Sequence, residues 1–269
     1  MAFLLSTKAP QMESTKLIRV VDGEETPGVH WLCFDLLSLE AKSAFFAFCL
    51  NLTETACRAK NELEAVTRIK NRYANWKALF RSVPSSTYSM ELVQGLFGEL
   101  YFLNNYMIGR YGVDDSVSAW SGPSATSKDY AINTDWFEVK TIGASSACVK
   151  INSLAQLSSL YPGKLVVVRV ERMAEEFSNG QSSIAELLSC ISSLIQDDTI
   201  ENAFFSKVSS YGVGINDEAF AVKFDVKSLH VYSVESGFPR ITFEEIPYSE
   251  INNVSYEISI AGIARFMEE

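Results

Sequence analysis

The chain has 269 residues, of which 47% are hydrophobic and 21% are charged, a composition typical of a globular protein with a substantial core. A net charge of −10 argues against a protein that grips nucleic acid unaided, because Lys and Arg supply most of the affinity for phosphate. No apolar run is long enough for a membrane span, and residues 1–5 lack the basic start and length of a signal peptide. We therefore expect a cytoplasmic protein with no membrane contact.

The cysteine and histidine patterns argue against a zinc-binding protein and against a disulfide-stabilised protein. The five cysteines form no CxxC pair, and His30 and His230 have no companions, so neither a structural zinc site nor a disulfide framework is indicated. We expect reduced, mostly buried thiols. The motifs GxGxxG and GxxxxGK are absent, and nucleotide binding is not expected.

The N-terminal part predicts a hairpin followed by helix. Residues 17–21 and 29–34 are apolar runs around a turn at 22–28, and residues 38–81 favour helix, with Trp76 and Phe80 at core spacing. This helical stretch is the most basic part of the chain, and it could contact phosphate or simply form a solvated helix face. Its cations are Arg58, Lys60, Arg68, Lys70, Arg72, Lys77 and Arg81. Residues 82–89 are a loop and the best boundary, with Ser89 as the cap of the next helix.

The remaining elements alternate between helices and strands. Leucines at helical spacing predict a helix over 92–103, followed by a long loop over 111–128 that could form a wall of a substrate cleft. The later helices are expected at 153–160, 184–195 and 200–208, and the strands at 135–142, 147–151, 164–170, 219–224, 229–234 and 254–258.

The strand at 135–142 organises the chemistry. Side chains alternate faces along a strand, so Glu138 and Lys140 point the same way. Asp129 precedes Glu138 by nine positions, and a hairpin of that length brings the two acids within reach of one ion. Two carboxylates suit Mg²⁺, beside which Lys140 can orient a water or stabilise an oxyanion. The alternative to a metal site is an exposed strand with Glu138 and Lys140 on its solvent-facing side.

A helix upstream carries Gly95, Gly98 and Glu99. Glycine costs a helix about 1 kcal/mol relative to alanine, so two in one helix indicate the close approach of another backbone. Glu99 lies beside them, and it could be a surface acid paired with Arg110 or Lys77.

Several short stretches carry a resemblance to a known family. In order along the chain they are RYANW at 72–76, GLFGEL at 95–100, WSGP at 120–123, EVKT at 138–141 and GFPRI at 237–241. From about residue 40 onward the chain resembles the PD-(D/E)XK proteins encoded in bacterial restriction and phage-defence gene clusters. One departure is that five residues separate Pro123 from Asp129.

The resemblance implies an α/β fold of the restriction-endonuclease-like type. It has a mixed central sheet flanked by helices, with an N-terminal hairpin and helical region and a β-rich C-terminal part. We expect three consecutive parts, at 1–85, 86–196 and 197–269.

The resemblance also implies a catalytic site. Asp129, Glu138 and the Val139 carbonyl would hold Mg²⁺, which Mn²⁺ could replace, and Lys140 would activate the water. Glu99 would join the metal shell or hold a second metal, because the helix before the motif strands often lends an acid in such nucleases. Gln156 and Gln94 are candidate accessory residues.

The expected function is a metal-dependent DNA endonuclease in a restriction or phage-defence system. The net charge predicts weak DNA affinity, so a partner such as an ATPase would deliver the substrate, and a homodimer is also compatible. A different class is a non-catalytic subunit with the same fold that assembles a defence complex. A small-molecule hydrolase is the third hypothesis, but no nucleophile elbow or Ser/His/Asp arrangement supports it.

Overall fold

The computed structural model describes residues 1–80, 89–123, 127–173, 182–213, 218–248, 250–251 and 253–268. Contacts between residues group the chain into two compact units, Met1–Tyr88 with Ser183–Val222, and Ser89–Ser182 with Lys223–Glu269. This grouping places residues 183–222 with the N-terminal segment. The three consecutive parts stay a prediction, and their first boundary, at 85/86, lies outside the described residues.

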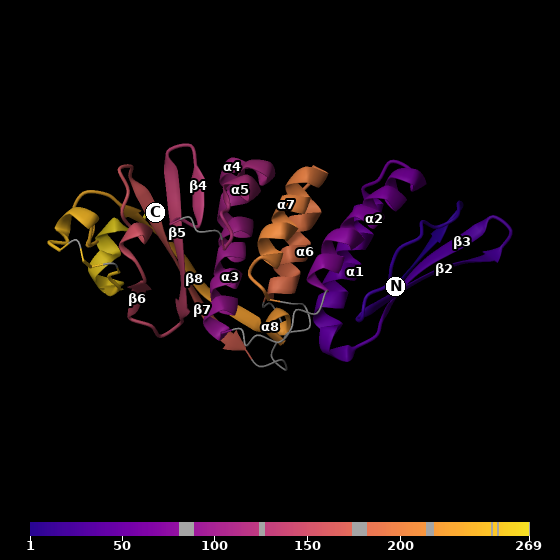
Figure 1. Cartoon of the computed structure of the whole chain (residues 1–269), viewed down its shortest axis with the longest axis horizontal. Helices are drawn as coiled ribbons and strands as arrows, with labels where there is room; N and C mark the ends of the chain where they lie inside the picture. Colours follow the sequence, from indigo (N-terminus) through magenta and orange to yellow (C-terminus); the bar gives the residue numbers. More distant parts are fainter. Residues whose placement is uncertain are drawn as a thin grey trace. The chain divides into compact units, whose positions relative to one another are not determined.

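The first unit begins with a three-stranded antiparallel sheet in the order β1–β3–β2, formed by Ala2–Leu5, Val29–Leu36 and Ile18–Thr26 (Figure 1). Strands β2 and β3 pair as a hairpin, and Gly28 in its turn has a φ of 84°. Such a φ strains residues with a Cβ, so glycine suits this position.

Helices make up the rest of the first unit: α1 (Lys42–Cys57), α2 (Glu62–Leu79), α6 (Ile184–Leu194), α7 (Asp198–Ser209) and α8 (Glu218–Ala221). The predicted stretch 38–81 is broken between α1 and α2, where Asn61 caps α2 by accepting a hydrogen bond from the Glu64 amide. Trp76 and Phe80 are buried among other aromatic rings, including Phe48 and Phe205, as their spacing predicts.

The core of the first unit also contains polar side chains. Arg72 of the RYANW stretch is buried, pairs with Glu201 of α7, and donates to the carbonyls of Ser192 and Ile195 at the C-terminal end of α6. Asn51 accepts from the Trp76 indole (3.0 Å) and donates to the Ser189 carbonyl (3.2 Å). These bonds tie α1 and α2 to α6 and α7.

The second unit contains a mixed sheet, as the resemblance implies. Its order is β4–β5–β7–β8, formed by Tyr130–Ile132, Asp135–Gly143, Gly163–Met173 and Lys223–Val234. Strands β5 and β7 are parallel, whereas the β4–β5 and β7–β8 pairs are antiparallel. Strand β7 is nearly continuous in Val and is buried along Leu165–Val168, as expected for a strand covered on both faces.

The two faces of this sheet are covered differently. Helix α3 (Met90–Phe102) packs on the face that carries Phe137 and Thr141. The opposite face carries Trp136 and packs against a second sheet of two strands, β6 (Cys148–Ile151) and β9 (Tyr256–Ser259), followed by a 3₁₀ segment at Ala261–Phe266 (Figure 1). By alternation, Glu138 and Lys140 point toward the face opposite α3.

Three expected elements differ in the structure. The predicted loop at 111–128 contains helix α5 (Val113–Ala119), which follows α4 (Ile108–Tyr111), and Asp114 and Asp115 favour its first turn electrostatically. The predicted helix at 153–160 is only a 3₁₀ turn, Leu154–Gln156. The first half of the predicted strand at 219–224 belongs to α8, whereas its last two residues begin β8. Ala219 and Phe220 are consecutive and both buried, unlike neighbours in a one-faced strand.

The thiols are less buried than the sequence suggests. Cys57 and Cys190 are exposed and the other three are half-buried, although all five are free. Among the helices in the described residues, none is long and apolar enough to cross a bilayer.

Candidate active site

The β4–β5 hairpin positions the first acid. Its turn contains Asn133, whose φ is 55°, and beyond the short strand β4 the backbone amide of Asp129 donates to the Phe137 carbonyl (3.1 Å). The Asp129 carboxylate in turn accepts from the Val139 amide at 2.6 Å. Asp129 therefore lies beside β5, the strand that carries Glu138 and Lys140, as the hairpin length predicts.

The second acid and the lysine come from β5 itself. The Lys140 amine lies 2.8 Å from the Glu138 carboxylate, and only 2% of Glu138 is exposed. A buried carboxylate needs a charged or hydrogen-bonding partner, which Lys140 provides. This excludes the alternative in which Glu138 is an acid on the wet face of an exposed strand.

Burial dominates the electrostatics of both acids. It raises the pKa of Glu138 to about 8, the negative charge of Asp129 adds to this rise, and the Lys140 charge opposes it. Burial also raises the pKa of Asp129, against the bond from the Val139 amide. Two carboxylates that disfavour charge in each other's presence form a site that a cation would stabilise.

A third oxygen faces the same edge of β5. The N–H and C=O of one residue point to the same side of a strand, so the Val139 carbonyl lies on the side where its amide meets Asp129. Two carboxylates and one carbonyl fit Mg²⁺, whose remaining positions are usually filled by water and substrate phosphate. The donor set of this edge thus suits the metal that the resemblance implies.

Lys128 is a site residue that the motif pattern did not single out. Its amine donates to the carbonyls of Ala155 (2.7 Å) and Gln156 (2.6 Å) and lies 3.8 Å from the centre of the Trp136 ring. Burial lowers the pKa of Lys128 to about 8, although the charges of Glu138 and Asp129 oppose this. Its position next to Asp129 in the sequence was the available signal.

Glu99 has contacts with Trp120 and Tyr130. It lies on α3, over the other face of the sheet, where its carboxylate accepts from the Trp120 indole (2.7 Å) and its backbone carbonyl accepts from the Tyr130 hydroxyl (2.9 Å). Within the described ranges, no three His, Cys, Asp or Glu side chains converge as a metal site. The described contacts join Asp129 and Glu138 to β5 and Lys140, and the role of Glu99 as a third acid of the metal site stays a prediction.

The two glutamines have separate positions. Gln94 of α3 donates to the Thr141 carbonyl at 3.0 Å and so supports the free edge of β5 next to the site. Gln156 accepts from the Asn152 amide at 2.7 Å, which occupies its side-chain oxygen in a local turn. Of the two, Gln94 has the direct contact with the motif strand.

A mixed α/β sheet with an acid–acid–lysine set at the edge of a central strand is consistent with the nuclease-like class that the sequence resembles. A family model described as "Putative PD-(D/E)XK family member (DUF4420)" matches residues 2–261. The chain belongs to this family. Comparison with curated proteins and with solved structures found no match.

Proposed function

We propose that the protein is a metal-dependent DNA endonuclease that acts in a bacterial restriction or phage-defence system. The observation that supports this most is the arrangement of Asp129, Glu138 and Lys140 at the edge of β5 in a chain of the PD-(D/E)XK family. Mg²⁺ would supply Lewis-acid activation of the phosphodiester and of the attacking water when bound there.

The roles of the residues follow from their contacts. Asp129, Glu138 and the Val139 carbonyl would hold the cation, and the bond from the Val139 amide fixes the direction of the Asp129 carboxylate. The Lys140 amine, held 2.8 Å from Glu138, would donate to a phosphate oxygen or orient the water. Glu99 contacts Trp120 and Tyr130, and its role as a third acid stays a prediction.

Cleavage of a plasmid in Mg²⁺ or Mn²⁺ tests the proposal. Lys140→Ala and Asp129→Asn should each lower the rate by about 10²-fold or more, because each removes an electrostatic contact to the reacting groups. Asp129→Asn keeps an acceptor for the Val139 amide, so its fold should be preserved. Lys150→Ala, which changes an exposed lysine on β6, is the matched control and should cut like the parent.

Equal cutting by Lys140→Ala and the parent would contradict the catalytic role. Circular dichroism of each variant separates lost chemistry from lost structure. The assay should be run with and without the products of neighbouring genes, because the net charge of −10 favours delivery of the DNA by a partner subunit such as an ATPase. A homodimer would also be detected in these preparations by its mass.

The alternative function is a non-catalytic subunit that assembles or regulates a defence complex. The acidic composition favours it, whereas the pairing of Glu138 with Lys140 beside Asp129 favours catalysis. Calorimetry with Mn²⁺ discriminates the two. The nuclease should bind the ion and lose that binding in Asp129→Ala, and a subunit without a metal site should show no difference between the two proteins.

A further inference from the structure

A polar cavity lies within the first unit, near the turn that joins α1 to α2. It has a volume of about 310 Å³, and its other side is formed by Ser193 in the last turn of α6 and by Ile195 and Gln196 just after that helix. The α1–α2 side contributes four cations and one acid to the lining: Arg58, Lys60, Arg68, Arg72 and Glu64. None of the residues in the proposed catalytic site lines this cavity.

The charges in this lining do not cancel. Arg68 pairs with Glu64 at 2.7 Å, and Arg72 pairs with the buried Glu201. Arg58 donates to the Ser193 carbonyl, and neither Arg58 nor Lys60 forms an ion pair with a carboxylate among the described residues. Glu64 accepts from the Lys60 backbone amide at 2.9 Å, and its charge acts on Lys60 as well as on Arg68. The lining therefore has two positive charges that form no ion pair with a described carboxylate, although the net charge of the whole protein is −10. A local positive potential of this kind attracts anions.

A buried hydroxyl in the same lining is unsatisfied. Thr55 is only 5% exposed, and its hydroxyl oxygen has no hydrogen-bond partner in the part of the chain that the structure describes. A buried polar atom without a partner is unfavourable, so a ligand that offers an acceptor to this hydroxyl would be stabilised in the cavity. A hydroxyl can donate to an anionic oxygen, as Lys and Arg do.

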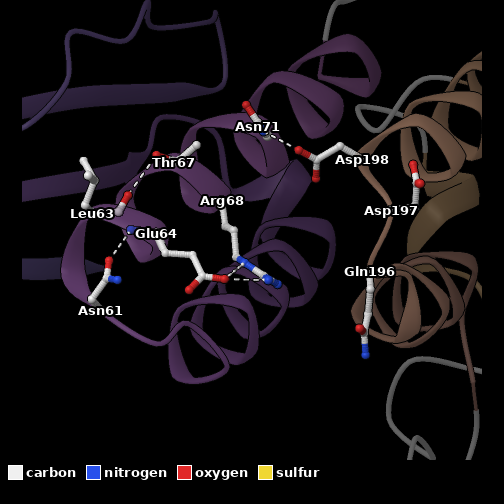
Figure 2. A pocket seen from close by; sticks show the side chains of 9 residues that line it. All are labelled: Asn61, Leu63, Glu64, Thr67, Arg68, Asn71, Gln196, Asp197 and Asp198. Carbon is white, nitrogen blue, oxygen red and sulfur yellow. Dashed lines mark hydrogen bonds and ion pairs between the residues drawn. The ribbon is translucent and has the colours of Figure 1, made fainter.

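A neighbouring open cavity of about 590 Å³ has a different character. It shares Glu64, Arg68 and Gln196 with the first cavity but is also lined by Asp197 and Asp198 (Figure 2). Asn71 donates to Asp198 at 2.8 Å and Arg68 donates to Glu64 at 2.7 Å (Figure 2). The carboxylates of Asp197 and Asp198 would repel an anion from the larger cavity. Of the two cavities, the one lined by Arg58 and Lys60 is therefore the candidate anion site.

We propose that the cavity lined by Thr55, Arg58 and Lys60 binds a phosphate group. Lys60 is exposed and free to reach an anion as a point charge, and the Arg58 guanidinium has donors beyond the one directed at Ser193. The phosphate can belong to a nucleic-acid strand, a nucleotide or inorganic phosphate, since all present the same oxygens. The proposal does not depend on nuclease activity.

Isothermal titration calorimetry of the full chain in EDTA tests this site while leaving the Asp129–Glu138 edge without metal. The probes are inorganic phosphate, adenosine monophosphate and a short single-stranded DNA oligonucleotide. We expect at least one probe to bind, and Lys60→Ala to weaken that binding about tenfold through loss of a charge-assisted bond. Thr55→Val, which keeps the shape of the side chain, should weaken it by a smaller factor.

Lys70→Ala is the matched control, because Lys70 is an exposed lysine of the neighbouring helix α2 that does not line the cavity. It should bind like the parent. Tightest binding of the oligonucleotide would identify a nucleic-acid backbone as the source of the phosphate, and equal binding of the small probes would identify a free phosphate. Absence of binding by all three probes, or equal losses in Lys60→Ala and Lys70→Ala, would overturn the proposal.

Discussion

Gly98 and Gly95 are both in α3, but Gly98 is closely packed whereas Gly95 has open space beside it. A Cβ added at Gly98 would lie 1.7 Å from the hydroxyl oxygen of Thr141, whereas a Cβ at Gly95 would meet nothing within 4 Å. Of the two glycines, only Gly98 is needed for the close approach of α3 to β5, and the prediction that Gly95 has the same role is wrong.

Substitution by alanine should separate these two positions. Gly98→Ala should destabilise the protein by about 1–3 kcal/mol, because the methyl group overpacks the interface between α3 and β5. Gly95→Ala should be neutral or stabilise the protein by up to about 1 kcal/mol through helix propensity. Urea unfolding followed by circular dichroism measures both, and equal midpoints for the two variants would show that α3 does not depend on this contact.

At the scale of the element, a single carboxylate connects the N-terminal residues to the start of α2. Glu62 accepts from the backbone amides and the hydroxyls of Ser6 and Thr7, at 2.8–3.0 Å. These bonds lower the pKa of Glu62 from 4.5 to about 2, with the Ser6 amide as the largest cause. The carboxylate therefore prefers its charged form more strongly in the folded than in the unfolded chain.

The lowered pKa gives a pH dependence with a definite sign. The stabilisation from Glu62 is fully present above about pH 4.5 and is lost as the pH falls toward 2, because only the unfolded chain binds a proton in that window. Glu62→Gln should lower the melting temperature at pH 7, and the difference from the parent should shrink at pH 3. A difference that is constant between these pH values would contradict the role of the charge.

The buried pair of Arg72 and Glu201 holds α2 against α7 and gives a further prediction. Arg72→Met would leave the Glu201 carboxylate buried without its cation, at a cost of about 3–5 kcal/mol in the free energy of unfolding. Arg68→Met is the control, because it removes only the half-exposed pair with Glu64, worth about 0.3–0.5 kcal/mol. Chemical denaturation measures both variants.

The second substitution Glu201→Leu sharpens this test. In the background of Arg72→Met it should recover part of the lost stability, because it removes the unpaired charge. If Arg72→Met and Arg68→Met unfold at the same denaturant concentration, the buried pair does not hold the helices together.

For the whole molecule, the net charge of −10 sets an expectation for DNA binding. In a gel-shift assay at physiological salt we expect the isolated protein to bind duplex DNA with a dissociation constant no tighter than about 10⁻⁶ M. The affinity should increase when the proposed partner subunits are added. Tight binding by the isolated chain would remove the need for a loading partner.

Local sequence patterns were sufficient to predict the arrangement of Asp129, Glu138 and Lys140 around β5. Period-two alternation and the hairpin length correctly placed Asp129 beside the strand that carries Glu138 and Lys140, because both depend only on nearby backbone geometry. The position of Glu99 could not be obtained in this way. It depends on which face of the sheet α3 covers, and that follows from the contact of Gly98 with Thr141.

The predicted helix at 153–160 failed for a reason that lies elsewhere in the chain. The carbonyls of Ala155, Gln156 and Ser158 accept from the Lys128 amine, and Arg240 donates to the Leu157 carbonyl. Pro162 has no N–H to offer to the Ser158 carbonyl, as a continued helix would require. Contacts between residues this far apart leave no local periodic signal.

The division of the first unit into two separate stretches of sequence has a consequence for synthesis on the ribosome. Residues 1–88 emerge first, but their helices pack against α6 and α7, which are translated about a hundred residues later. At a rate on the order of 10 residues per second, the early helices wait roughly ten seconds with their apolar faces uncovered. A nascent chain stalled before residue 183 should therefore recruit chaperones at its N-terminal segment, and release of residues 183–222 should end that association.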